Sequence, residues 1–283
     1  EQRKRDEEAR EERKNQLLKT DIIINKMPVQ NAILDVPSIS ASASDQESTR
    51  IYEEAVSSLG IVRLVEPPQM QESLLQPLTF DWTRQQEKDS YVHVVEWCRV
   101  NLPEKKAYDV SVGQKCSQGN LYHITLCSFR QELGQHGIEA HVKPVVRLKG
   151  RPDIVITLKP PDGHDILFHN RVYVLVAIEV KKSLTDSEYS SSYREAEKHL
   201  LGLCAYNSFS SPLVLLSDLN AVHSVLYLTS TSRPLKFTVA SRQFKCFHLA
   251  MKFCLEMHPE RANDCLRDFG RAVSPLHEDS VVS

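Results

Sequence analysis

The sequence predicts a mixed α/β fold, a mixed sheet flanked by helices, preceded by a largely helical or irregular N-terminal region. Three observations support this fold class. Short runs of β-branched and apolar residues recur after residue 120. Segments with apolar residues at helical spacing separate these runs. Hydrophobic residues make up 41% of the 283 residues, which is enough to bury a core.

The N-terminal part predicts little regular structure. Residues 1–28 open with a run of mixed charges and indicate a charged helix or linker. Residues 29–118 are expected to form an accessory region of unknown role. Its serine-rich stretch at 36–49 lacks a hydrophobic period, which is typical of disorder.

Two segments of the accessory region carry an apolar pattern. Tyr52, Val56 and Leu59 predict a short helix that ends at Gly60. The apolar residues between 90 and 100 fit a helix or a strand equally well. Residues 62–78 contain three prolines and are expected to be irregular.

Residues 119–260 are expected to form the core, followed by a C-terminal tail at 261–283. The expected elements, in chain order, are a helix at 120–133, strands at 141–148, 153–158 and 172–181, a helix at 188–206, strands at 213–217, 222–228 and 235–239, and a helix at 242–257. A right-handed crossover through the helix at 188–206 would make strand 213–217 parallel to strand 172–181.

Three ionisable residues lie at the ends of two strongly β-forming runs. Asp153 precedes the run 154–158, and Glu179 and Lys181 close the run 172–178. Because side chains alternate across a strand, Glu179 and Lys181 point to one face. Carboxylates that hold Mg²⁺, together with an ammonium, are what metal-assisted cleavage of a phosphodiester requires. The alternative is a salt bridge between Glu179 and Lys181 at a strand edge, with Asp153 capping a turn.

This combination of residues resembles the PD-(D/E)xK nuclease motif, and the order of elements resembles the restriction-endonuclease-like core. The runs at 202–205, 212–220 and 225–228 are similar to the nuclease domain of Crinkler-type effectors, with a resemblance that covers about residues 118–258. The resemblance implies an endonuclease that depends on Mg²⁺ or Mn²⁺ and acts on DNA. It also implies a secreted effector that works in a host nucleus.

The resemblance assigns roles to individual residues. Asp153 and Glu179 would bind the metal, with the Val180 carbonyl as a further oxygen ligand, and Lys181 would orient or deprotonate the attacking water. A further glutamate is often found on the helix before the first strand, and Glu132 is the candidate here.

Basic residues near the motif are candidates for contacts with phosphates of DNA. Lys149, Arg151 and Lys182 flank the motif in sequence and would position a duplex without reading its bases. On the helix at 188–206, Lys198 is a further candidate, and Glu195 and His199 match no position of the motif. Each of these basic residues has the alternative of an ordinary solvated charge.

Composition excludes some classes of function. The formal net charge is -2, so no global basic field attracts nucleic acid. No apolar run is long enough to span a membrane, and a membrane partner is not expected. The chain lacks the glycine-rich loops of nucleotide-binding proteins and the Gly-x-Ser-x-Gly elbow of serine hydrolases. Seven cysteines without Cys-x-x-Cys pairs favour a reducing intracellular compartment at the site of action.

Two hypotheses of different classes remain. The first is a metal-dependent DNA endonuclease. The second is a catalytically inactive nuclease-like fold that serves as a DNA- or protein-binding effector module, because a fold does not determine a function. The N-terminal region is the candidate for contacts with a protein partner.

Overall fold

The computed structural model describes residues 36–68, 78–101, 108–112, 120–134, 137–158, 174–206, 212–232 and 235–257. From Pro37 onward these residues belong to one compact unit. The expected charged helix or linker at 1–28 and the expected tail at 261–283 lie outside the described residues.

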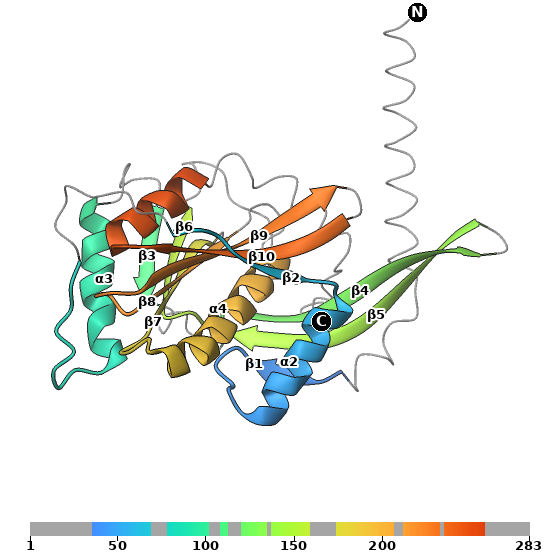
Figure 1. Cartoon of the computed structure of the whole chain (residues 1–283), viewed down its shortest axis with the longest axis horizontal. Coiled ribbons are helices and arrows are strands. Elements are labelled where there is room, and N and C mark those ends of the chain that lie inside the picture. Colours follow the sequence, from blue (N-terminus) through green and yellow to red (C-terminus); the bar gives the residue numbers. More distant parts are fainter. Residues whose placement is uncertain are drawn as a thin grey trace, which may run out of the picture. The chain divides into compact units, whose positions relative to one another are not determined.

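The larger of two sheets has seven strands. These are β2 (Val62–Val65), β3 (Tyr108–Val112), β6 (Ile154–Leu158), β7 (Val174–Val180), β8 (Leu213–Ser217), β9 (His223–Ser232) and β10 (Leu235–Phe244). Their order across the sheet is β2-β10-β9-β8-β7-β6-β3 (Figure 1). The pairs β7–β8 and β2–β10 are parallel, and the other neighbours are antiparallel. This mixed sheet confirms the predicted fold class, and β7 and β8 pair in parallel, as expected for these two strands.

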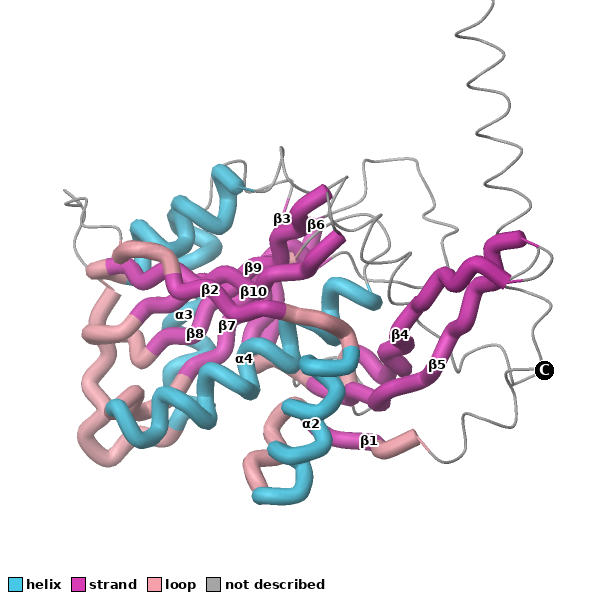
Figure 2. Tube along the Cα trace, turned by 45° about the vertical axis from the view of Figure 1, so that its right-hand side comes forward, coloured by secondary structure: helices cyan, strands magenta, loops and turns pink. Residues whose placement is uncertain are grey.

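The smaller sheet has three strands, β1 (Ser38–Ser40), β4 (Tyr122–Gly134) and β5 (Gly137–Gly150). Their order is β1-β5-β4, with β1 parallel and β4 antiparallel to β5. Figure 2 shows β4 and β5 running side by side as one long hairpin.

Helices cover both faces of the large sheet. They are α2 (Gln46–Ser58), α3 (Glu87–Asn101), α4 (Asp186–Tyr206) and a helix over residues 247–257. One apolar cluster joins α4 and α2 to both sheets and includes Ala177 of β7. A second cluster joins α3 and helix 247–257 to the opposite face and includes Ile178 and Val180. Because side chains alternate along β7, Glu179 lies on the face that α4 covers.

Several elements differ from the sequence-based expectation. Residues 120–133 form strand β4 rather than a helix, because they pair along their length with β5. The serine-rich stretch is ordered: β1 pairs with β5, and the Asp45 side chain caps α2 by accepting a hydrogen bond of 2.8 Å from the Ser48 amide. The last helix begins at residue 247, because β10 continues to Phe244.

The expected accessory region takes part in both sheets. Strand β2 pairs with β10, β3 pairs with β6, and β1 pairs with β5. Helix α3, where the sequence left helix and strand open, packs on the large sheet. No division of the described residues near residue 118 is present, since the compact unit begins at Pro37.

Candidate functional site

Glu179 is a buried carboxylate in an otherwise apolar strand. Every residue of β7 is buried, and Glu179 is 3% exposed on the face toward α4. An ionised carboxylate in such a place requires partners, because leaving it unpaired costs several kcal/mol, on the order of the desolvation penalty of an ion. The partners of Glu179 therefore define the candidate site.

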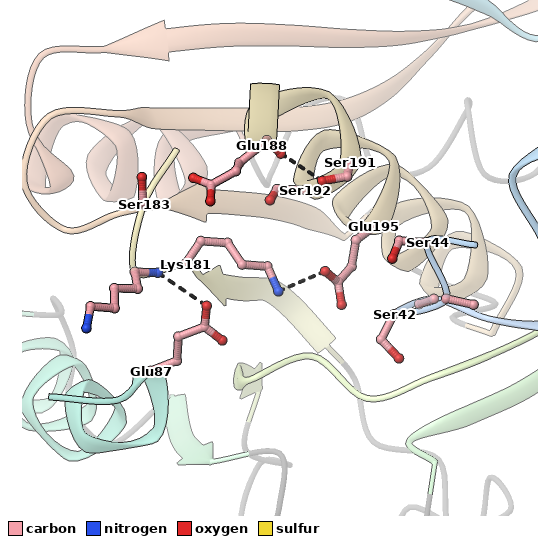
Figure 3. A pocket seen from close by; sticks show the side chains of 12 residues that line it. Ser42, Ser44, Glu87, Lys181, Ser183, Glu188, Ser191, Ser192 and Glu195 are labelled. Atoms are coloured by element: carbon pink, nitrogen blue, oxygen red, sulfur yellow. Dashed lines mark hydrogen bonds and ion pairs between the residues drawn. The ribbon is translucent and has the colours of Figure 1, made fainter. Parts of the chain in front are cut away.

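Lys181 lies between two carboxylates. Its Nζ is 2.9 Å from Glu179 Oε1 and 2.8 Å from Glu195 Oε2 on α4, and Figure 3 shows the ammonium pointing at Glu195. Burial lowers the pKa of Lys181, but the charges of Glu179 and Glu195 outweigh burial and raise this pKa above its usual value. Lys181 is consequently held as an ammonium and acts as a cation and hydrogen-bond donor.

Asp153 faces the same end of β7 from the start of β6. Its Oδ2 accepts a hydrogen bond of 2.8 Å from the Val180 amide, and its Oδ1 accepts one from the Tyr91 hydroxyl on α3. Burial raises the pKa of Asp153 to about 6, although these two hydrogen bonds and the charge of Lys181 lower it. Both oxygens of Asp153 thus already have a protein donor.

The second oxygen of Glu179 faces a histidine. Glu179 Oε2 is 3.5 Å from His199 Nε2, and it has no hydrogen-bond partner among the described residues. Burial, the charge of Asp153 and that of Glu195 raise the pKa of Glu179 well above its usual value, against the opposing effect of Lys181. Burial together with the charges of Lys181 and Lys198 lowers the pKa of His199 to about 3, so the imidazole is neutral.

Glu179, Glu195 and His199 could hold a metal ion. Each offers one ligand atom, and these three atoms lie within 4.8 Å of one another. Glu195 and His199 are four residues apart on α4, so both face β7 from the same side of the helix.

Tyr122 fixes the other side of the His199 ring. Its hydroxyl lies 3.0 Å from His199 Nδ1 and 3.3 Å from the Lys198 carbonyl. The Tyr122 ring fits against Gly150 and Gly202, where a Cβ on either glycine would collide with it. The absence of these two side chains is what allows Tyr122 to reach the histidine.

A polar pocket of about 390 Å³ opens beside Lys181 and Glu195 (Figure 3). Its lining contains serine hydroxyls from three segments, together with charged side chains: Ser42, Ser44, Ser183, Ser191, Ser192, Glu87, Lys181, Lys182, Glu188 and Glu195. The pocket gives a polar ligand access to Lys181 and Glu195.

The structure brings Asp153, Glu179 and Lys181 together, as the motif predicts for their positions. The ion pair between Glu179 and Lys181, which was the alternative for these residues, is also present. Val180 contributes its amide to Asp153. Glu132 lies on β4, near the end of the hairpin and opposite Glu139, rather than on a helix.

The candidate phosphate-binding residues differ in their surroundings. Lys149 and Arg151 are partly exposed at and just beyond the end of β5. Lys182 is exposed, its amide donates to Glu87 Oε1 at 3.2 Å, and its Nζ donates to the Gln85 carbonyl at 3.2 Å.

Lys198 lies inside the fold. It is 2% exposed, and its Nζ donates hydrogen bonds to the carbonyls of Ala43 (2.6 Å) and Ala41 (3.3 Å). Burial lowers the pKa of Lys198. These contacts fit a structural role that ties the segment before α2 to α4, rather than the expected contact with a phosphate.

The sequence pattern alone indicates no role for Glu195, His199, Tyr122 or Tyr91. The spacing of Glu195 and His199 was a usable signal, because residues at i and i+4 share a face of a helix. Tyr91 and Tyr122 had no comparable signal, since their contacts depend on how distant elements pack.

Comparison with protein-family models finds no family that matches the chain, and a search of curated proteins finds no match. Among the helices of the described ranges, none is long and apolar enough to cross a membrane.

Proposed function

We propose that the protein is a metal-dependent nuclease that hydrolyses phosphodiester bonds of DNA. The observation that supports this proposal is the convergence of Asp153, Glu179 and Lys181 at one end of the paired strands β6 and β7, beside a polar pocket. The resemblance to Crinkler-type effectors adds nuclear DNA of a host as the expected substrate.

The carboxylates are the groups that would hold the metal. Glu179 Oε2 offers an oxygen without a hydrogen-bond partner among the described residues, and Asp153 retains lone pairs beyond its two hydrogen bonds. Mg²⁺ or Mn²⁺ bound there would stabilise negative charge on the phosphate and lower the pKa of a bound water.

In the proposed hydrolysis, a water oxygen forms a bond to phosphorus and the bond from phosphorus to the 3′ oxygen breaks. The products are a 5′-phosphate and, after the leaving oxygen takes up a proton, a 3′-hydroxyl. Lys181 serves as the ammonium that neutralises charge on the phosphate and orients the water. Lys149, Arg151 and Lys182 are retained as candidates for contacts with neighbouring phosphates.

Cleavage of supercoiled plasmid by the purified protein tests the proposal. We expect nicking with Mg²⁺ or Mn²⁺ and none with EDTA. Glu179→Gln keeps the shape of the side chain but removes its charge, so we expect it to slow nicking by at least about 100-fold. The matched control is Glu188→Gln, which changes an exposed carboxylate on the wall of the same pocket and is expected to cleave normally.

Equal activity of Glu179→Gln and the unaltered protein would contradict the proposal. Circular dichroism of each variant checks that the fold is retained. Asp153→Asn provides a second variant, because Asp153 lies on a different strand end and is expected to show the same loss.

A binding module is the second candidate, and the contacts of Asp153 favour it. Both of its oxygens accept hydrogen bonds from the protein, and Lys181 is shared by two carboxylates, so the polar groups largely satisfy one another. This class would be favoured if the protein binds labelled DNA in EDTA and shows no cleavage of DNA with any metal ion.

A further inference from the structure

The pair formed by Glu179 and His199 has an arrangement that protein contacts alone do not account for. Glu179 Oε2 is buried, lacks a hydrogen-bond partner among the described residues, and faces His199 Nε2 at 3.5 Å. This separation is long for a hydrogen bond, whose ordinary range ends at about 3.2 Å. An uncompensated carboxylate oxygen in the core is costly, and a cation bound to both atoms would remove that cost.

The separation suits two ligands of one metal ion. Ligands at about 2.1 Å from a tetrahedral metal are about 3.4 Å from each other. The carboxylate of Glu195 supplies a third ligand atom within 4.8 Å of the other two. Glu195 also lines the polar pocket, so one of the three ligand residues can be reached from that pocket.

The contacts around His199 prepare its Nε2 as a ligand. The Tyr122 hydroxyl can donate to the Lys198 carbonyl and accept a hydrogen bond from His199 Nδ1. In that arrangement Nε2 carries a lone pair directed toward Glu179. A hydrogen-bond partner on the second ring nitrogen is the usual way in which proteins orient a histidine that binds metal.

The charges nearby also leave room for a cation. Three carboxylates, those of Asp153, Glu179 and Glu195, lie around the ammonium of Lys181. A second ammonium, that of Lys198, is near enough to His199 to lower the pKa of the imidazole. Lys181 contacts Glu179 Oε1 and Glu195 Oε2, and it leaves Glu179 Oε2 open. A second cation at the open oxygen would therefore not displace Lys181.

We propose that Glu179, Glu195 and His199 bind a first-row transition-metal dication, in preference to Mg²⁺. The imidazole decides the preference, because Mg²⁺ selects oxygen ligands whereas Mn²⁺ and Zn²⁺ also accept histidine nitrogen. This site deepens the proposed function and rests on it for its biological purpose. It differs from the expected carboxylate site in that it uses two residues of α4 instead of Asp153.

The site is tested by adding Mn²⁺ to the full chain and measuring its binding by electron paramagnetic resonance. Mn²⁺ is a better probe than Zn²⁺ because the chain has seven cysteines whose thiols compete for zinc. We expect one tightly bound Mn²⁺ per chain that excess Mg²⁺ displaces poorly. We also expect a ¹⁴N coupling from the imidazole in the spin-echo spectrum.

The variant His199→Gln should weaken Mn²⁺ binding by at least about tenfold and abolish the ¹⁴N coupling. Glu188→Gln, which alters the pocket wall but not the three ligands, should change neither. If His199→Gln does not fold, Glu195→Gln provides the same test of affinity from a residue nearer the surface. A protein that binds no Mn²⁺, or binds it without ¹⁴N coupling, would overturn the inference.

The outcomes separate this inference from the nuclease proposal. Histidine-ligated Mn²⁺ without any DNA cleavage would support the metal site and contradict the nuclease. Cleavage that is lost in Glu179→Gln but unchanged in His199→Gln would support the nuclease and overturn the site with a histidine ligand.

Discussion

Glu179 places the two oxygens of one carboxylate in different surroundings. One oxygen accepts a hydrogen bond from the Lys181 ammonium, and the other faces a neutral imidazole. The strand position explains this difference, because Lys181 follows on the same face of the sheet while α4 crosses over that face. The two oxygens of Glu179 are therefore placed for different interactions.

At the scale of residues, the sequence predicts the part of the site that depends on local geometry. Glu179 and Lys181 are two positions apart on a strand, so their common direction follows from alternation alone. The contribution of α4 could not be predicted in the same way, because it depends on which helical turn lies over the end of β7. Tyr91 reaches Asp153 across 62 positions of sequence, a contact with no local signature.

His223 gives a prediction for the dependence of stability on pH. It is 1% exposed and its Nδ1 lies 2.8 Å from Ser217 Oγ, and burial lowers the pKa of His223 to about 4. Because the usual pKa of histidine is about 6.5, the unfolded chain takes up the proton first as pH falls. The contribution of neutral His223 is therefore present above about pH 6.5 and is lost as the pH falls toward about 4.

Between neutral pH and about pH 4.5, we expect the free energy of unfolding to fall by about 2 kcal/mol because of His223. Urea unfolding at the two pH values measures this loss. His223→Gln should lose less stability over the same range, because glutamine does not take up a proton. Identical losses in the two proteins would show that His223 titrates equally in the folded and unfolded states.

At the scale of elements, the sequence predicts most strands of the large sheet, but it predicts a helix where β4 lies. The strand β8 occupies the expected residues, and β6, β7, β9 and β10 overlap their expected ranges. The expectation of a helix before β5 was wrong because Leu121, Ile124, Phe129 and Leu133 also fit helical spacing. Tyr122, Ile124 and Leu126 alternate along β4 and pack into one apolar cluster, which is the pattern of a strand.

The glycines near the end of β4 are compatible with the end of a helix or with the end of a strand. Gly134 follows the last residue of the helix expected at 120–133, whereas in the structure it pairs with Gly137 at the end of β4. A glycine pair is compatible with either event, since it favours a change of chain direction in both. Only pairing with β5 distinguishes the two, and pairing partners are set by tertiary structure.

The link between β2 and α4 gives a second prediction. Glu197 of α4 is fully buried, and its oxygens accept hydrogen bonds from Arg63 Nε at 2.9 Å and from a second nitrogen of the same guanidinium at 2.8 Å. Arg63→Ala would leave this carboxylate in the core without its cation. We expect a loss of about 2 kcal/mol in the free energy of unfolding, below the values for fully buried pairs because Arg63 is partly exposed.

The matched control is Glu53→Gln. Glu53 binds the same guanidinium at 2.8 Å but lies on the surface, so its loss should cost less than about 1 kcal/mol. Urea unfolding of both variants compares them directly. Equal effects of the two substitutions would contradict the structural importance assigned to the buried partner.

At the scale of the whole molecule, the N-terminal segments are part of the main fold. Strands β2 and β3 form the two edges of the large sheet, and α3 covers one of its apolar faces. A fragment of residues 119–260 would remove α3 from that face and leave β6 and β10 with one neighbour each instead of two. We therefore expect this fragment to lack a cooperative unfolding transition, whereas residues 37–260 retain one.

Urea unfolding, monitored by tryptophan fluorescence and circular dichroism, would compare the two fragments with the full chain. Only circular dichroism applies to the shorter fragment, because both tryptophans, Trp82 and Trp97, precede residue 119. A sharp transition in the fragment 119–260 would contradict this expectation and would support a separate domain.

The parallel pairing of β2 with β10 has a consequence for protein synthesis. Val62 pairs with Thr238, so β2 leaves the ribosome long before β10, its neighbour in the sheet, is translated. At about 5 to 20 residues per second, this interval lasts roughly ten to thirty seconds. The nascent chain carries Val62, Leu64 and Val65 unpaired throughout that time, and the large sheet is completed only after β10 has been translated.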